Sequence, residues 1–265
     1  MEGVSLKALV VLTPSESKRL IAKAVASMGI VKDALKNGIL VIIKGTTNSY
    51  VAEEILGRKI DKDRYARGIV IPERLTGIPG GSQIPDIILE KGKVREDLAL
   101  GQVGKGTKDV FEILKAGDVI IKGANALDPS WTAGIYLGDP YAGTIGLSMR
   151  VAFARGIDLI IPVGLEKLVP TPIKDFIMDL GIQRIALSMG SKIGMMPVPG
   201  TVVTELEAFK ILTGVEALNI GAGGVAGAEG ARVFLLKGDE ESVKKAYSLA
   251  ESIKGEPPYK PIATG

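Results

Sequence analysis

The chain of 265 residues contains no cysteine and no histidine. Without cysteine there are no disulfides, thiol nucleophiles or thiolate metal ligands, and without histidine there is no imidazole base and no histidine-bound zinc. Any catalysis must therefore use Lys, Arg, Asp, Glu, Ser, Thr, Tyr, backbone amides or a bound cofactor. A hard cation such as Mg²⁺ on carboxylates stays open, but the sequence identifies neither a metal site nor a cofactor.

Aromatic residues make up only 5% of the chain, and the formal net charge is +3. No dense Lys/Arg stripe with interleaved aromatics is present, so we do not expect nucleic acid as a partner. No apolar run approaches 18 residues, and residues 1–12 lack the pattern of a signal peptide. The sequence therefore predicts no membrane association and a cytoplasmic location.

The chain contains one short sequence repeat, in two similar copies. Residues 35–45 read Leu-Lys-Asn-Gly-Ile-Leu-Val-Ile-Ile-Lys-Gly, and residues 114–123 read Leu-Lys-Ala-Gly-Asp-Val-Ile-Ile-Lys-Gly. A strand that is apolar on every residue is typical of a parallel sheet covered on both faces. Ligands bind at the carboxyl ends of strands in open α/β sheets. The repeat therefore predicts that Lys44 and Lys122 lie close together at one edge of the sheet.

The rest of the pattern alternates between strands and helices, which predicts one α/β domain over 1–265 with a mainly parallel sheet and helices on both faces. Hydrophobic residues reach 46%, which suits a compact core. We expect strands near 8–12, 39–43, 68–71, 85–89, 118–121, 157–162, 182–188, 215–220 and 231–236. We expect helices near 14–28, 49–56, 107–114, 143–154, 172–179, 203–212 and 239–253, the first capped by Thr13 with Pro14 and Glu16.

Residues 68–106 interrupt this alternation. They are rich in glycine and proline, including Ile78-Pro79-Gly80-Gly81-Ser82 and the stretch from Gly101 to Gly106. We interpret them as an irregular insertion or small subdomain, serving as a lid or an oligomer contact, with plain surface loops as the alternative.

The first candidate site follows the first copy of the repeat. Gly45, Thr46, Thr47 and Asn48 stand between a buried strand and a helix, where backbone amides and hydroxyls suit a phosphate or carboxylate. The alternative is a turn in which Thr47 or Asn48 merely caps the helix. Lys44 and Lys122 would pair with that anion, or one of them would act as an amine nucleophile; the alternative is two solvated lysines at strand ends.

The second candidate site follows the second copy. Lys122, Gly123 and Asn125 come directly after the strand, and Asp128 follows shortly afterwards. With His and Cys absent, Asp128 is the best candidate for a proton-transferring group, and Lys122 for the stabiliser of an oxyanion. A turn formed by Asp128 before Pro129 is the structural alternative.

Two further segments attract attention. The run from Gly221 to Gly230 suggests a dinucleotide loop, but it leads into a strand, whereas that fingerprint must open a helix. We therefore predict a hairpin loop there. Glu205, early in a helix, is a second candidate carboxylate, although an acid at that place more often complements the helix dipole.

The motifs together resemble one superfamily. Three segments carry the resemblance: a helix with Lys-Arg-Leu-Ile-Ala at 18–22, then Gly-Thr-Thr-Asn at 45–48, then Lys-Gly-Ala-Asn-Ala-Leu-Asp at 122–128. In this order they are similar to segments of ribose-5-phosphate isomerase, glucosamine-6-phosphate deaminase, the CoA transferases and the regulatory subunits of translation-initiation exchange factors. The resemblance covers about the first 150 residues. It implies a phosphate-binding loop at 45–48 and a site turn at 122–125.

The chain also departs from that superfamily. The isomerases have two acidic residues in the second turn, where this chain has Lys122 and Asn125. Residues 138–143 do not match their Gly-Gly-Gly stretch with its catalytic Lys and Glu, and the Glu-Asn-Gly signature of CoA transferases is absent. The resemblance therefore implies the fold and an anionic ligand more than one reaction.

We expect a homo-oligomer that binds a small phosphorylated or carboxylated metabolite at the carboxyl edge of the sheet. The catalytic version is a proton-transfer enzyme like a sugar-phosphate isomerase. The alternatives are a non-catalytic metabolite sensor and a CoA transferase-like enzyme.

Overall fold

The computed structural model describes residues 5–77, 82–101 and 106–260. Its central sheet has six strands in the order β14 (Thr201–Val203), β12 (Asp158–Pro162), β9 (Val119–Ile121), β2 (Ile39–Ile42), β5 (Ile87–Glu90) and β6 (Lys93–Val94). The first four run parallel, and β5 and β6 add antiparallel strands at one edge. The predicted α/β class and mostly parallel strands are confirmed.

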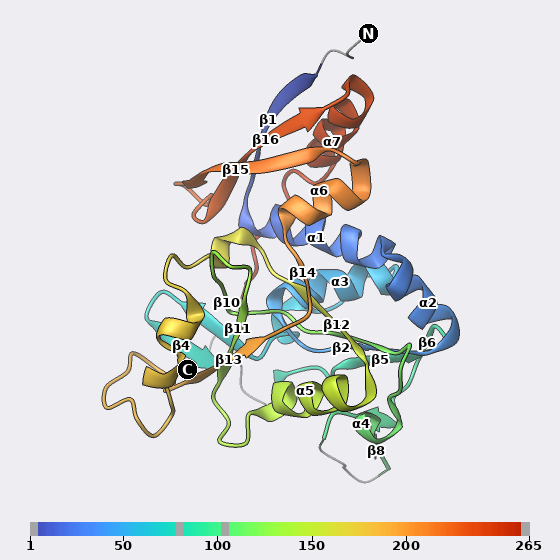
Figure 1. The fold of residues 1–265 in the computed structure, drawn as a ribbon, viewed down its shortest axis with the longest axis vertical. Helices are drawn as coiled ribbons and strands as arrows, with labels where there is room; N and C mark the ends of the chain where they lie inside the picture. The colour runs from blue at the N-terminus through green and yellow to red at the C-terminus, as the bar shows by residue number, and fades with distance from the viewer. Residues whose placement is uncertain (1–4, 78–81, 102–105, 261–265) are drawn as a thin grey trace.

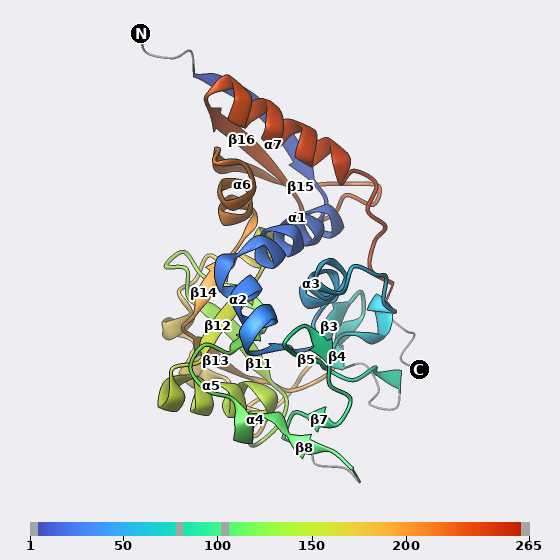
Figure 2. The same cartoon turned by 90° about the vertical axis from the view of Figure 1, so that its right-hand side faces the viewer.

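Helices lie above and below this sheet (Figures 1 and 2). On one side are α1 (Pro14–Ser27), α2 (Gly29–Asn37) and α3 (Thr46–Leu56); on the other are α4 (Val110–Ile113) and α5 (Gly143–Arg155). The strands β2 and β9 are buried at every residue, because both faces are covered. The predicted capping box of α1, formed by Thr13 and Glu16, is present.

The two copies of the repeat pack side by side. Leu40, Val41 and Ile42 pair in parallel with Val119, Ile120 and Ile121. At their amino ends the Asp118 carboxylate accepts the backbone N–H of Ile39 at 2.7 Å and that of Lys115 at 2.8 Å. A Cβ at Gly38 would lie 2.6 Å from that carboxylate, so the first copy needs glycine for this approach.

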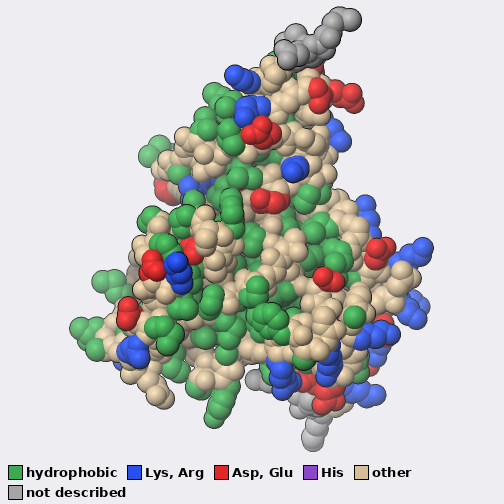
Figure 3. Space-filling model, viewed as in Figure 1, with side chains coloured by type: hydrophobic (Ala, Val, Ile, Leu, Met, Phe, Trp, Pro, Cys, Tyr) green, Lys and Arg blue, Asp and Glu red, His purple; other side chains and the backbone are tan. Residues whose placement is uncertain are grey.

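A second, antiparallel sheet stands beside the first, in the order β1 (Leu6–Leu12), β16 (Ala231–Gly238) and β15 (Glu216–Gly223). The helices α6 (Glu205–Thr213) and α7 (Glu240–Ser252) cover its inner face, and its core is continuous with that of the central sheet. The outer face keeps exposed apolar side chains, and hydrophobic groups are visible on this part of the surface in Figure 3. The exposed apolar side chains of these strands include Leu9, Val11, Leu218 and Ile220.

Some predicted elements are wrong. Residues 182–188 form turns rather than a strand, and 172–179 form two short 3₁₀ turns (Ile173–Asp175 and Ile177–Asp179) instead of a helix. The missing strand is β13 (Gly194–Val198), which pairs with β11 (Ala133–Leu137) and, through it, with β10 (Ala126–Leu127). The secondary structure of these regions depends on pairing between segments that are distant in the sequence, and local hydrophobic periodicity does not predict such pairing.

The glycine- and proline-rich insertion is only partly described. It contains β3 (Gly68–Ile71) paired with β4 (Arg74–Gly77), then β5 and β6 of the central sheet, and β7 (Leu98–Ala99), which pairs with β8 (Lys108–Asp109). Short 3₁₀ turns lie at Lys62–Arg64 and Leu165–Lys167. The predicted glycine-rich turns at 78–81 and 102–105 lie outside the described residues.

Candidate functional site

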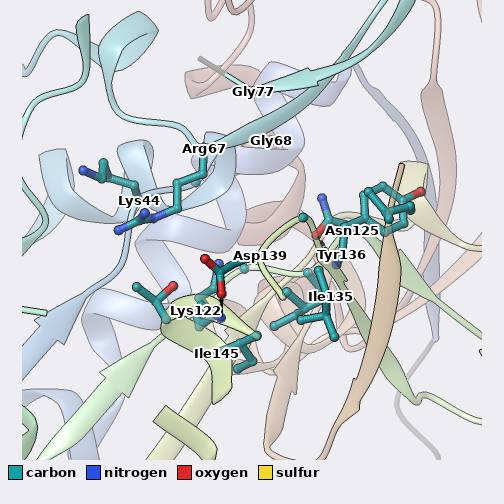
Figure 4. A pocket seen from close by; sticks show the side chains of 18 of the residues that line it. Lys44, Arg67, Gly68, Gly77, Lys122, Asn125, Ile135, Tyr136, Asp139 and Ile145 are labelled. Atoms are coloured by element: carbon teal, nitrogen blue, oxygen red, sulfur yellow. Dashed lines mark hydrogen bonds between the residues drawn. The ribbon is translucent and has the colours of Figure 1, made fainter. Parts of the chain in front are cut away.

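A cavity of about 370 Å³ opens at the carboxyl ends of β2 and β9 (Figure 4). Its walls come from both copies of the repeat, from the β3–β4 hairpin, from β11 and from the start of α5. The polar and charged side chains that line it are those of Lys44, Thr46, Thr47, Arg67, Thr76, Lys122, Asn125, Tyr136, Asp139, Thr144, Lys167 and Ser191.

The two repeat lysines meet at this cavity, as predicted. Since Ile42 pairs with Ile121 in adjacent parallel strands, Lys44 and Lys122 follow at the same edge of the sheet. The backbone N–H of Lys122 continues the sheet by donating to the Ile160 carbonyl at 2.9 Å. The Lys44 Nζ lies 3.7 Å from the Asp86 carboxylate.

Arg67 adds a third cation, which the sequence did not indicate because it stands in the irregular segment after α3. Its guanidinium donates to Asp86 at 2.9 Å, so one carboxylate faces both Arg67 and Lys44. Burial lowers the pKa of Lys44, and Asp86 only partly offsets that effect. Two cations that share one carboxylate leave positive charge for a ligand.

Lys122 is the least compensated group of the cavity. Within the described ranges its ammonium makes no hydrogen bond or ion pair, whereas the fourth cation, Lys167, donates to the Ala124 carbonyl at 2.9 Å. Burial lowers the pKa of Lys122 to about 8; the nearby Arg67 and Lys167 act in the same direction, and the Asp86 carboxylate opposes them without offsetting them. Lys122 is therefore partly neutral in mildly alkaline solution.

The start of α3 supplies hydrogen-bond donors. Its first intrahelical hydrogen bond runs from the Ser49 N–H to the Gly45 carbonyl at 2.9 Å. The backbone N–H groups of Thr46 and Thr47 therefore have no acceptor within the helix. No side chain caps this end, and Gly45 is in the N-cap position. The Thr47 hydroxyl is buried and has no hydrogen-bond partner. Free amides at the positive end of a helix suit an anion.

The start of α5 approaches the same cavity, although no residue of this helix was among the predicted site residues. Ala142, Gly143 and Thr144 line the wall. The N-cap residue Ala142 makes no side-chain bond to the helix, but the Asp139 carboxylate accepts the N–H of Tyr141 at 2.8 Å and that of Gly143, the first residue of α5, at 3.2 Å. The amino ends of α3 and α5 and four cations thus line one space, and Asp139 already binds one amide of the α5 end.

Asn48, predicted to bind ligand, instead lies beneath the cavity. Its side-chain amide donates to the carbonyl of Ile43 at 2.7 Å and to that of Ile121 at 3.1 Å. Gly123 and Asn125 do line the cavity. The Asn125 side chain also accepts the backbone N–H of Tyr136 at 3.0 Å, which orients that turn against β11.

Asp128 is not brought into the cavity. One of its oxygens accepts the Ser130 N–H at 2.9 Å, the Ser130 hydroxyl at 2.7 Å and the Thr132 N–H at 3.0 Å, and the other accepts the Ile173 N–H at 2.9 Å. Although burial opposes it, these bonds hold the pKa of Asp128 below its usual value. This geometry fits the turn-forming alternative rather than proton transfer.

Glu205 is fully buried behind the site and does not line it. It accepts the Leu165 N–H at 2.9 Å, and burial, helped by the Glu166 carboxylate, raises its pKa to about 7. Glu166 pairs with Lys18 at 3.1 Å; burial opposes ionisation, but Lys18 and Lys167 hold the pKa of Glu166 low.

Three further observations concern metals, the glycine-rich run and membranes. Across the described parts of the chain, no cluster of three or more Asp or Glu side chains could hold a metal ion. The run from Gly221 to Gly230 joins β15 to β16 as a hairpin, as predicted. No helix among the described residues is long and apolar enough to cross a membrane.

The chain was compared with protein-family models, with curated proteins and with solved structures, and none of the three comparisons gives a match.

Proposed function

We propose that this chain binds a small phosphorylated or carboxylated metabolite in the cavity at the carboxyl ends of β2 and β9. The carrying observation is the surplus of positive charge: Lys44, Arg67, Lys122 and Lys167 line the cavity with Asp139 as the single acidic lining residue in the described ranges. Asp86, just behind, faces two of the cations. Lys44 is buried and Lys122 and Lys167 are partly buried, so their surplus positive charge costs free energy in the ligand-free protein and is relieved by an anion.

The backbone supports the same ligand. The uncapped amino end of α3 and the buried, unpartnered Thr47 hydroxyl provide donors where the positive charge is concentrated. An oxyanion with several acceptor oxygens, such as a phosphate or a carboxylate, satisfies amides, hydroxyl and ammonium groups together.

Thermal unfolding tests this proposal. Phosphate, sugar phosphates and small dicarboxylates are titrated against the protein, and a ligand present at about 100 times its dissociation constant stabilises by about 2.7 kcal/mol. Lys122→Met should weaken the effect, while Lys174→Met, at an exposed lysine outside the cavity, should not. A panel of such anions that leaves the unfolding temperature unchanged would refute the proposal.

The catalytic version is supported by Lys122. An amine with a pKa of about 8 can accept a proton from a carbon next to a carbonyl, and the resulting ammonium then stabilises the enediolate oxygen. Incubation of sugar phosphates with the protein in D₂O separates the versions. Deuterium incorporation that Lys122→Met abolishes indicates an enzyme, and binding without incorporation indicates a sensor.

A further inference from the structure

A second cavity, of about 940 Å³, adjoins the first. The two share five lining residues: Thr46, Gly68, Asn125, Tyr136 and Lys167. The shared residues form the junction, so a ligand held by the cations of the first cavity can extend into the second.

Among the described residues that line it, the second cavity has no surplus of positive charge. Its acidic residues are Glu16, Glu166, Glu229 and Glu256, and its basic residues are Lys18 and Lys167. Glu166 pairs with Lys18 at 3.1 Å, Glu16 with Lys254 at 2.7 Å, and Glu256 with Arg19 at 3.0 Å, while Glu229 accepts the Gly227 N–H at 3.0 Å. An uncharged group fits this space better than a second anion.

Part of the remaining wall is apolar and aromatic. Ile69, Val70, Leu168 and Val169 line it, and Val70 is 75% exposed, so it is available to a ligand. Tyr136 stands at the junction and Tyr259 farther along the wall. Aromatic side chains stack on planar rings, and apolar side chains gain by being covered.

The wall formed by the C-terminal segment is fixed in place. The Gly255 N–H donates to Glu16 at 2.9 Å, the Tyr259 hydroxyl to the Asp63 carbonyl at 3.0 Å, and the Lys260 N–H to the Asp63 carboxylate at 2.9 Å. The cavity therefore exists before a ligand arrives, which lowers the entropic cost of binding.

We propose that the natural ligand is a phosphomonoester of nucleoside size. Its phosphate lies in the first cavity and its uncharged, ring-bearing group passes Tyr136 into the second. The first cavity alone is near the lower end of the range for small-molecule sites, and the adjoining volume accommodates the rest of the ligand. This inference rests on the proposed anion site.

Calorimetric titration tests it with inorganic phosphate, ribose 5-phosphate and the 5′-monophosphates of adenosine, guanosine, cytidine and uridine. At least one nucleotide should bind ten times more tightly than ribose 5-phosphate. Val169→Trp, which fills the second cavity, should reduce that advantage to less than threefold and leave phosphate affinity unchanged. Leu168→Trp, at a 39% exposed position, serves if the first variant does not fold. Val94→Trp, on β6 outside both cavities, is the control.

The outcomes separate the two proposals. If phosphate and ribose 5-phosphate bind and no nucleotide binds more tightly, the extended ligand is refuted and the anion site stands. An equal loss of affinity for all ligands in the tryptophan variants likewise refutes it. If none of the phosphates binds, the proposed function itself fails.

Discussion

The side-chain amide of Asn48 donates to the carbonyl oxygen of Ile121 at 3.1 Å and so joins the first turn of α3 to the end of β9. The same amide reaches the Ile43 carbonyl at the end of β2. At the other end of these strands Asp118 binds the Ile39 N–H. The two copies of the repeat are therefore fixed to each other at both ends, which holds the cavity walls in register.

Asn48→Ala should lower the free energy of unfolding by about 1–3 kcal/mol, because it leaves buried carbonyls with fewer donors. It should also weaken phosphate binding, since α3 loses its attachment to β9. Urea unfolding measures the first effect and calorimetry the second. Asn219→Ala is the matched control: Asn219 donates to the carbonyls of Gly221 and Val233 in the β15–β16 hairpin, so its loss should destabilise without changing phosphate affinity. Equal effects of both variants on binding would contradict this role of Asn48.

Lys122→Met should stabilise the ligand-free protein at pH 7 by about 1–2 kcal/mol while weakening phosphate binding. In the unfolded chain Lys122 keeps its proton up to a pKa near 10.5, but in the folded protein it loses it near 8. The unfolded state therefore binds more protons between these values, and this group makes stability rise with pH from about 8 to 10.5. The rise should be smaller in the variant. A variant less stable than the native protein at pH 7 would contradict the account.

Glu205→Gln should change the pH dependence of stability between pH 4.5 and 8, where the native protein loses stability as the pH rises. The folded pKa of about 7 lies above the ordinary value of 4.5, so the folded state keeps a proton that the unfolded state releases. The stability contributed by this group is fully present below pH 4.5 and is lost as pH rises through 7. Thermal unfolding from pH 4.5 to 8 should show a smaller decline in Glu205→Gln. Glu241→Gln, at an exposed site on α7, should keep the native profile.

Asp128→Asn should destabilise the fold by about 1–3 kcal/mol, because the new amide group must face at least one of the donors that now bind the carboxylate. Phosphate affinity should stay within about twofold, since Asp128 does not line the cavity. A variant with native stability that no longer binds phosphate would show that Asp128 takes part in ligand binding, and would contradict this prediction.

The repeat explains why the two central strands of the main sheet could be predicted from the sequence. Its fully apolar runs identify β2 and β9, and equal spacing places Lys44 and Lys122 at one edge. Arg67 and the start of α5 were not predictable as site components, because the turns that carry them join the cavity only through tertiary packing. Asn48 and Asp128 are not among the lining residues of the cavity, and the sequence could not indicate this for a related reason. A polar side chain of the same type can form a turn, bind the end of a strand or bind a ligand, and only its hydrogen-bond partners distinguish these uses.

The cavity between α3 and Lys122 is proposed to hold an anion, and soaking a crystal with tungstate would locate that anion. Tungstate is a tetrahedral dianion whose metal gives a strong anomalous signal. We expect a tungstate peak in this cavity, with oxygens about 3 Å from the amides of Thr46 and Thr47 and from the Lys122 ammonium. The peak should be lost in Lys122→Met and kept in Lys174→Met. Tungstate bound only elsewhere on the surface, with this cavity holding none, would contradict the account.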